Sequence, residues 1–231
     1  MTTLVKICGI TTPADARAAA EAGADMLGVN LWPGSPRHVP VDTARALRDA
    51  VDGGPALVAL FVDADARHIA EALAETGIVH AQLHGPAPAG VTPLIRATTP
   101  DEADEIDAPW LLLDAHVPGQ RGGTGRSFDW SLARPFATRR PVMLAGGLNP
   151  ANVAQAIAIS GAGAVDVCSG VEQAPGVKDL AAMRAFVRAA QTVARPDPSV
   201  VPAKAGTSTR TNTTSSAIGV PASAGTTGDQ A

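Results

Sequence analysis

Residues 110–130, WLLLDAHVPGQRGGTGRSFDW, contain the pattern that decides the fold of this chain. An uninterrupted apolar run, Trp110–Leu113, ends at Asp114 and is followed by a glycine-rich loop. A continuous apolar run this short favours a strand of a parallel sheet that is covered on both faces. Proteins with such sheets place their chemistry at the carboxyl ends of the strands. Asp114 is therefore the first candidate for a functional residue.

The same kind of apolar run recurs along the chain. Eight strands are expected, at Leu4–Gly9, Met26–Trp32, Ala56–Val62, Ile78–Leu83, Leu94–Ala97, Trp110–Asp114, Pro141–Ala145 and Ala164–Cys168. Helical patterns separate most of them, at Pro13–Ala24, Asp42–Val51, Asp65–Thr76, Asn149–Ser160 and Asp179–Ala194. Strands and helices that alternate in this way form right-handed parallel crossovers. Eight such units within the length of one domain predict an α/β fold, a single (β/α)8 TIM barrel, rather than an open sheet.

Two segments depart from this regular pattern. Residues 85–94, GPAPAGVTPL, are too rich in proline and glycine for a helix, so we expect a loop in place of the barrel's fourth helix. The following PDEADEID (100–107) forms a short helix at most. Residues 195–231 lack aromatic side chains and are dense in Ser, Thr, Gly, Ala and Pro, which predicts a disordered tail without a catalytic role. The expected organisation is a barrel over residues 1–194 and a low-complexity tail over 195–231.

Composition and charge narrow the classes of partner. With 231 residues, 45% of them hydrophobic, the chain can bury a substantial core as one domain. Its net charge of −4, without a cluster of Lys and Arg, argues against nucleic-acid binding, and its apolar runs are too short to cross a membrane. Two cysteines make no disulfide framework, the histidines show no metal-ligand spacing, and the N-terminus does not resemble a secretion signal. We expect a cytoplasmic protein with a small-molecule partner and with neither a nucleic-acid nor a membrane partner.

Glycine-containing turns follow the seventh and eighth predicted strands. Gly146 and Gly147 follow the seventh strand, and Ser169 and Gly170 follow the eighth. Glycine lets backbone N–H groups approach a phosphate closely, and the N-terminus of a following helix adds a favourable dipole. Either turn alone is equally well explained as a tight connection. Two such turns on neighbouring strands favour a phosphate site at the mouth of the barrel.

Cys8 ends the first predicted strand, immediately before Gly9. A free cysteine is most often an inert core residue, and an isolated acid such as Asp114 can cap a turn or pair with Arg121 or Arg126. Placed across one barrel mouth, however, a thiol whose pKa lies near neutrality and a carboxyl group can act as base and acid. The pair is therefore a candidate catalytic pair.

Arg37 and His84 follow the second and fourth predicted strands. A loop arginine is usually a solvated surface residue, but over the mouth Arg37 can fork onto a substrate carboxylate. A histidine in the position of His84 can equally serve only to tie neighbouring loops together. Both are candidate binding residues, each with an ordinary structural alternative.

Seven blocks of the sequence carry a family resemblance: VKICGI (5–10), GSPRHV (34–39), AQLHG (81–85), LLDA (112–115), GGTGRSFDW (122–130), LAGGLNPANV (144–153) and DVCSGVEQAPGVKD (166–179). They resemble the signature segments of phosphoribosylanthranilate isomerase, a family of tryptophan-pathway enzymes often built as a single (β/α)8 barrel. The blocks fall in the family's order and cover residues 4 to about 190.

The resemblance implies an Amadori rearrangement of N-(5-phosphoribosyl)anthranilate to 1-(2-carboxyphenylamino)-1-deoxyribulose 5-phosphate. In that reaction Asp114 matches the general acid that protonates the furanose ring oxygen and opens the sugar to a Schiff base. Cys8 matches the general base that removes the C2′ proton. Arg37 matches the residue that holds the anthranilate carboxylate. His84 lies in a matching block as a further substrate-binding candidate.

The resemblance also assigns the glycine-rich segments. Gly122 and Gly123, within residues 122–125, match a flexible loop that closes over the substrate. The phosphate site is matched by the turns after the last two strands: Gly146, Gly147, Ser169 and Gly170. No metal or organic cofactor is implied, and a monomer or homodimer is expected.

The sequence departs from the family pattern in three places. The segment after His84 is shortened, Gly34 stands where lysine is common, and Cys168 stands where serine is usual. Two alternatives to the isomerase remain open. One is the histidine-pathway isomerase, but that family places an aspartate where Cys8 stands. The other is a catalytically silent phosphate-binding barrel that acts as a binding or scaffold module, and the presence of Cys8, Asp114 and both phosphate turns argues against it.

Barrel closure makes the first and eighth strands neighbours, so Cys8 and Cys168 end adjacent strands. This predicts that a mild oxidant couples the two thiols and silences the enzyme reversibly, provided that their Cα atoms lie within roughly 7 Å. Activity measured before and after oxidation, and again after reduction, tests the prediction. Unchanged activity with both thiols still titratable would contradict it.

Overall fold

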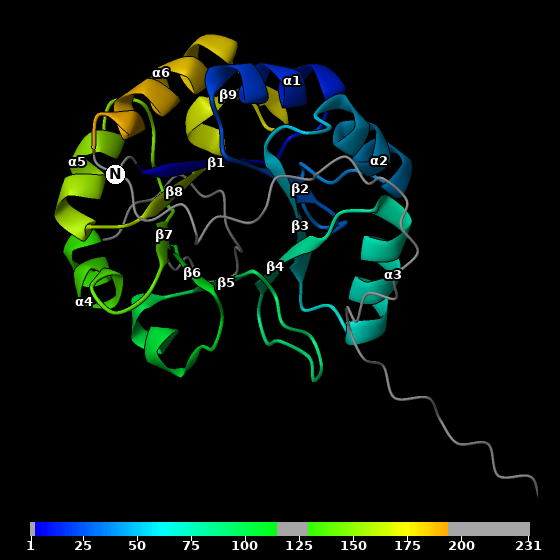
Figure 1. The fold of residues 1–231 in the computed structure, drawn as a ribbon, viewed down its shortest axis with the longest axis horizontal. Helices are drawn as coiled ribbons and strands as arrows, with labels where there is room; N and C mark the ends of the chain where they lie inside the picture. Colours follow the sequence, from blue (N-terminus) through cyan, green and yellow to red (C-terminus); the bar gives the residue numbers. More distant parts are fainter. Residues whose placement is uncertain (1–2, 115–128, 194–231) are drawn as a thin grey trace, which may run out of the picture.

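The structure is a computed structural model that describes residues 3–114 and 129–193. Its eight central strands form a closed parallel barrel in which each strand pairs with the next and β8 pairs with β1 (Figure 1). The predicted TIM barrel is confirmed. The strands are β1 (Leu4–Cys8), β2 (Met26–Asn30), β3 (Ala56–Val62), β4 (His80–His84), β5 (Ile95–Thr98), β6 (Trp110–Leu113), β7 (Val142–Leu144) and β8 (Ala164–Val167).

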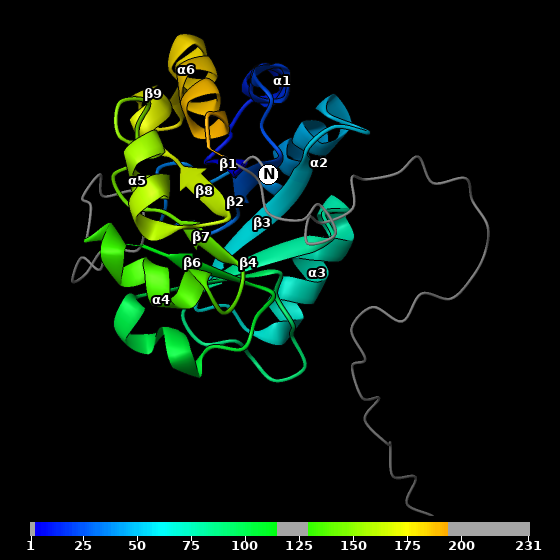
Figure 2. The ribbon, with the colours of Figure 1, turned by 60° about the vertical axis from the view of Figure 1, so that its left-hand side comes forward.

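Helices surround the strands in the order of the sequence. In Figure 1, α1 to α3 cover the strands on one side and α4 to α6 on the other, and the turned view of Figure 2 agrees. No helix in the described part of the chain is long and apolar enough to cross a membrane. The helices are α1 (Pro13–Ala22), α2 (Val41–Ala50), α3 (Ala66–Thr76), α4 (Arg134–Ala137), α5 (Val153–Ser160) and α6 (Leu180–Gln191).

Short elements complete the barrel. Among the described residues, 3₁₀ turns lie at Pro100–Glu105, Trp130–Ala133 and Ser169–Val171, and a small two-stranded sheet is formed by β9 (Glu172–Ala174) and β10 (Val177–Lys178). Residues 85–94, between β4 and β5, contain no helix, as the sequence predicts. The predicted lid glycines Gly122 and Gly123 and the predicted tail 195–231 lie outside the described residues.

Most observed elements are shorter than the predicted ones because capping residues and turns were counted with them, whereas β3 is as predicted and α2, β4 and β5 lie one or two residues away from their predicted positions. Asp65 and Asp179 are N-caps: their carboxylates accept the N–H groups of His68 at 2.7 Å and Ala182 at 2.9 Å. β2 stops at Asn30 because the Asn30 side chain accepts the Trp32 N–H at 2.9 Å and begins a turn. These differences move element ends by a few residues and leave the topology unchanged.

Buried apolar residues form two separate clusters. The larger packs the outer faces of the strands against the helices, and Phe186 and Val187 of α6 belong to it. The smaller contains strand residues and fills the amino end of the barrel interior, with Leu4, Trp110 and Leu112 among its members. The interior is therefore apolar at the amino end, which leaves the carboxyl end for polar side chains.

Phe186 offers a test of this packing, because its fully buried ring joins α6 to the barrel. We expect Phe186→Ala to lower the free energy of unfolding by about 3–5 kcal/mol, the usual cost of removing a buried aromatic ring. The exposed Arg188, in the same helix, provides the control, and Arg188→Ala should change it by less than about 0.5 kcal/mol. Urea denaturation measures both, and equal effects would contradict the assignment of α6 to the core.

Candidate active site

Cys8 and Asp114 lie at the same rim of the barrel. Cys8 is the last residue of β1, and Asp114 directly follows β6. All eight strands are parallel, so both residues are at the carboxyl end. Leu4 and Leu112 belong to the interior cluster, and side chains alternate along a strand, so Cys8 and Asp114 also face the interior. The structure thus brings the predicted pair to one mouth.

Gly28 makes room for the Cys8 thiol. Gly28 lies opposite Cys8 in the β1–β2 pairing. A Cβ atom at Gly28 would lie 2.6 Å from the Cys8 Sγ and 3.0 Å from the Lys6 Nζ. Any larger residue at position 28 would therefore force the thiol to move, so the glycine leaves the space that the sulfur occupies.

A buried ion pair lies below the thiol. Lys6, two residues before Cys8 on the same face of β1, is fully buried, and its Nζ lies 2.9 Å from the Asp166 Oδ1 of β8. Burial lowers the pKa of Lys6, but Asp166 and Cys8 more than offset it, so the pKa is raised above its usual value. Lys6 therefore stays charged next to the thiol.

The pKa of Cys8 is lowered to about 7. The largest cause is a hydrogen bond from the Cys168 thiol, burial opposes it, and the positive charge of Lys6 adds to the lowering. The pKa of Cys168 is raised well above its usual value, because it shares this hydrogen bond and is buried. Cys8 is thus the thiolate of the pair and Cys168 the donor. Both cysteines are free, and their oxidative coupling stays a prediction.

Arg37 lies at the same rim, in the loop after β2. Its guanidinium contacts Glu172, which begins β9, with the Nη2 2.7 Å from the Oε2. This hydrogen-bonded pair raises the pKa of Arg37 and, with Lys178, lowers that of Glu172 against the effect of burial. Arg37 is thus mostly buried, with its side chain 11% exposed, and is not the solvated surface residue of the structural alternative.

His84 is the last residue of β4 and is half-buried. Its Nε2 lies 2.9 Å from the Nε2 of Gln82, two residues earlier on the same face of the strand. The structure therefore places His84 at the rim, on the opposite side of the ring from β8.

The two glycine turns pack against each other. Gly146 and Gly147, after β7, have left-handed φ angles of +81° and +65°. Ser169 and Gly170 form the 3₁₀ turn after β8, and a Cβ atom at Gly170 would collide with the carbonyl oxygen of Leu148. The predicted phosphate turns are therefore adjacent, and glycine is required there by the backbone.

Sequence reasoning missed four charged residues of this rim: Lys6, Asp166, Glu172 and Lys178. Each lies inside a block that carries the family resemblance, but no role was assigned to it. A signal existed for Lys6 and Asp166, since each lies two residues before a rim cysteine and so on the same face of its strand. Nothing in the local pattern marks Glu172 and Lys178, which meet only when β9 and β10 fold over the end of β8.

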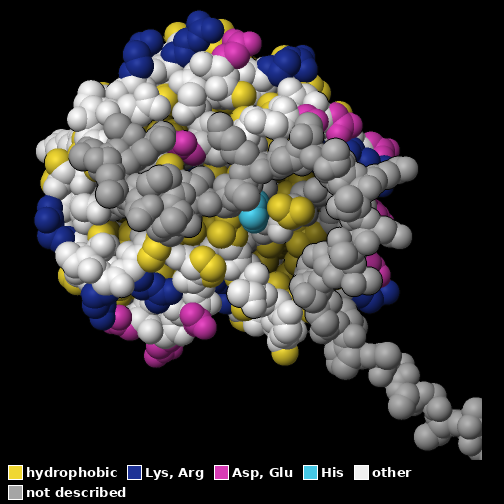
Figure 3. Space-filling view, viewed as in Figure 1, with side chains coloured by type: hydrophobic (Ala, Val, Ile, Leu, Met, Phe, Trp, Pro, Cys, Tyr) yellow, Lys and Arg dark blue, Asp and Glu magenta, His cyan; other side chains and the backbone are white. Residues whose placement is uncertain are grey.

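The face viewed in Figure 3 has hydrophobic side chains and a histidine near the middle of the ring, with most charged side chains toward its edge. Within the described residues, no group of three or more His, Cys, Asp or Glu side chains could hold a metal ion. The chemistry that these side chains offer is proton transfer by a thiol and a carboxyl group, beside cationic groups and glycine turns suited to anions.

Comparison with known proteins agrees with this arrangement. The family model described as N-(5'phosphoribosyl)anthranilate (PRA) isomerase matches residues 5–189. The chain is 42% identical over 209 residues to the N-(5'-phosphoribosyl)anthranilate isomerase of Myxococcus xanthus. This alignment covers 84% of this chain and 98% of the relative.

Solved structures agree as well. The phosphoribosyl anthranilate isomerase of Thermus thermophilus has a TM-score of 0.72 at 37% identity, covering 81% of this chain and 98% of that one. A second such isomerase was solved in complex with reduced 1-(o-carboxyphenylamino)-1-deoxyribulose 5-phosphate. It has a TM-score of 0.70 at 32% identity and covers 83% of this chain and 100% of that one. The chain therefore belongs to the phosphoribosylanthranilate isomerase family.

Proposed function

We propose that this protein is an enzyme of tryptophan biosynthesis that isomerises N-(5-phosphoribosyl)anthranilate to 1-(2-carboxyphenylamino)-1-deoxyribulose 5-phosphate. The observation that carries the proposal is the thiol of Cys8, with its pKa lowered to about 7, at the same barrel rim as Asp114. Family membership supplies the substrate, because the relatives are named for it and one was solved with a reduced form of the product.

The reaction begins at Asp114. Its carboxyl group gives a proton to the furanose ring oxygen, the bond from that oxygen to C1′ breaks, and the nitrogen lone pair forms a protonated Schiff base with C1′. Charge develops on the leaving oxygen, so a positioned acid lowers the barrier. The cationic nitrogen can then accept the C=N electron pair when the C2′–H bond breaks, so the hydrogen on C2′ becomes acidic.

Cys8 completes the reaction as the base. Its thiolate takes the C2′ proton, and the released electron pair forms a C1′–C2′ double bond and neutralises the nitrogen. The enolamine then gains a proton at C1′ and loses that of its 2′-hydroxyl, which leaves the ketone with the composition of the reactant. A base with a pKa near 7 combines a substantial thiolate fraction with useful basicity at neutral pH.

The other candidate residues bind the substrate. Arg37 meets the anthranilate carboxylate, and the adjacent turns containing Gly147 and Gly170 present backbone N–H groups to the phosphate. His84 contacts the substrate from the opposite side of the ring. Gly122 and Gly123, which lie outside the described residues, belong to the loop that closes over it.

We also infer that the protein acts in the cytoplasm as a monomer or homodimer, without a nucleic-acid partner. The net charge of −4 supports the absence of a nucleic-acid partner. Its substrate is a small soluble phosphate ester, which fits an enzyme that works on intermediates inside the cell.

Asp114→Asn tests the acid. The amide cannot give up a proton in this way, so we expect the turnover number to fall by about 10² to 10⁴. The affinity for the product should change little, because the amide keeps the shape of the carboxyl group. Loss of substrate fluorescence measures turnover. The exposed Asp107, before the amino end of β6, is the control, and Asp107→Asn should leave turnover unchanged. Turnover like that of the parent in Asp114→Asn would contradict the assignment.

The pH dependence tests the base. We expect kcat/KM to increase as pH rises through about 7, because Cys8 must lose its proton to act. Cys168→Ala removes the hydrogen bond that lowers the pKa of Cys8 most, so the increase should move to higher pH. Cys168→Ser keeps a donor and is the matched control, with a profile close to that of the parent. Identical profiles for all three proteins would show that Cys8 is not the titrating base or that Cys168 does not tune it.

A further inference from the structure

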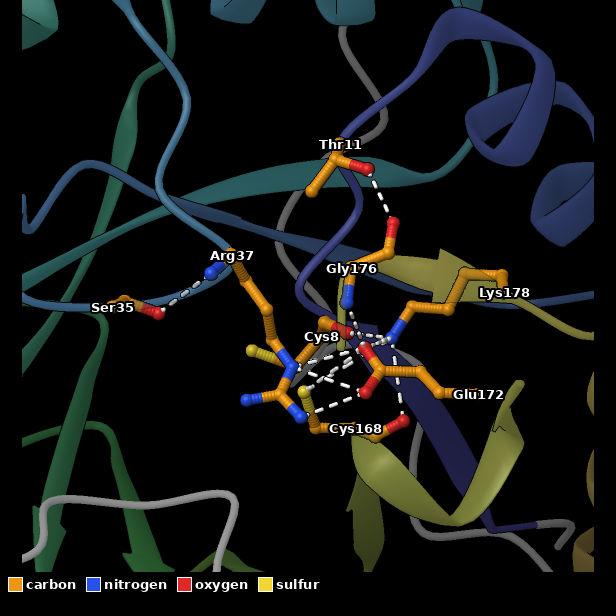
Figure 4. A network of polar contacts seen from close by, with 8 residues as sticks. All are labelled: Cys8, Thr11, Ser35, Arg37, Cys168, Glu172, Gly176 and Lys178. Atoms are coloured by element: carbon orange, nitrogen blue, oxygen red, sulfur yellow. Dashed lines mark hydrogen bonds and ion pairs between the residues drawn. The ribbon is translucent and has the colours of Figure 1, made fainter. Parts of the chain in front are cut away.

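Glu172 gathers more polar contacts than its position in a short edge strand requires (Figure 4). Its side chain is only 3% exposed. The Arg37 Nε donates to both carboxylate oxygens, at 2.9 and 3.1 Å, and the Nη2 donates to the Oε2 at 2.7 Å. The Lys178 Nζ donates to the Oε1 at 2.8 Å, as does the Gly176 N–H at 3.3 Å. The Cys168 thiol lies 3.8 Å from the same oxygen.

These contacts hold the Arg37 guanidinium by one edge. The Glu172 carboxylate accepts hydrogen bonds from the Nε and the Nη2, and the Nη1 donates in none of the contacts described above. A guanidinium offers five N–H donors in one plane, so the same group can bind a second anion through its remaining donors. Glu172 thus fixes the plane of Arg37 and leaves a donor edge for another carboxylate.

The stem of Arg37 is held as well. A Cβ atom at Gly9 would lie 2.6 Å from the Arg37 Cδ, so the stem runs across the glycine that directly follows β1. The Ser35 hydroxyl accepts the backbone N–H of Arg37 at 3.1 Å and fixes the loop. With backbone, stem and head group all held, Arg37 does not have to be ordered when a ligand arrives.

Lys178 anchors Glu172 in turn. The fully buried Lys178 Nζ donates to the carbonyl oxygens of Cys8, at 2.6 Å, and Cys168, at 3.3 Å. These carbonyls lie where β1 and β8 end. Lys178 therefore links the Glu172 carboxylate to the backbone beside the two thiols. Because Glu172 in turn holds Arg37, the position of the guanidinium also depends on this backbone.

We propose that Glu172 is a positioning residue of the isomerase: its carboxylate holds the Arg37 guanidinium so that the Nη1 edge meets the carboxylate of the anthranilate ring. The inference rests on the proposed function and adds to it the residue that orients the substrate. A purely structural role, in which Glu172 only neutralises Lys178, predicts the same loss for every substrate. The two roles are therefore separable by the substrate used.

The test compares Glu172→Gln with the parent on two substrates, N-(5-phosphoribosyl)anthranilate and N-(5-phosphoribosyl)aniline, which lacks the carboxylate. We expect KM for the first to rise about tenfold, with kcat within about threefold, because the lost contact acts on binding. KM for the aniline compound should be unchanged by the substitution. The exposed neighbour Gln173, altered to Ala, is the matched control and should behave as the parent with both substrates.

Thermal melting shows whether Glu172→Gln folds at the assay temperature. If it does not, Glu172→Asp takes its place, because it keeps the charge near Lys178 but is one methylene too short for the two-nitrogen contact. The same selective rise in KM is then expected. An equal rise with both substrates, or no rise, overturns the inference. Absence of turnover by the unsubstituted protein would instead overturn the proposed function, and the inference with it.

Discussion

The ion pair between Lys6 and Asp166 is the interaction on which the site depends. Register pairs these two residues across the β1–β8 seam, where the barrel closes. A fully buried lysine is costly unless a carboxylate accompanies it, so closure of the barrel and charging of Lys6 require each other. Once the seam is in register, Cys8 and Cys168 must follow at the rim, because each lies two residues further along its strand.

The charges around the thiol are balanced for a thiolate. Lys6, Lys178 and Arg37 are cations, and Asp166 and Glu172 are carboxylates, which leaves one net positive charge in this group when Cys8 is neutral. Loss of the Cys8 proton neutralises the group. A thiol in an apolar pocket would keep its proton at neutral pH, since burial alone raises its pKa. The polar carboxyl end of the barrel, beyond the apolar cluster, is therefore a requirement of the chemistry as well as a feature of the packing.

The sequence is most predictive where the signal is local. Eight apolar runs, the helices between them and the proline-rich segment after His84 each follow from short-range pattern, and the barrel follows from their order. Cys8 and Asp114 were found because strand ends in a parallel barrel share one rim. Partners such as Glu172 and Lys178 were not found, because their contacts join residues far apart in the sequence. Glu172 contacts Arg37 over a separation of 135 residues, and Lys178 contacts Cys8 over a separation of 170. Such contacts depend on the register of closure, which periodicity does not encode.

The segment without a helix, between β4 and β5, lies beside a buried arginine whose hydrogen bonding is incomplete. Arg96, on the outer face of β5 by alternation with Ile95, is only 9% exposed, and burial lowers its pKa. Its Nε has no hydrogen-bond partner among the residues described. This is a poorly satisfied position, and it lies beside β4 and β5, across the ring from the β1–β8 seam (Figure 1). The outward-facing residues of the β1–β8 seam, Val5, Ile7 and Val165, are fully buried, and α6 packs against β1, so the poorly satisfied position lies apart from the seam that sets the thiol.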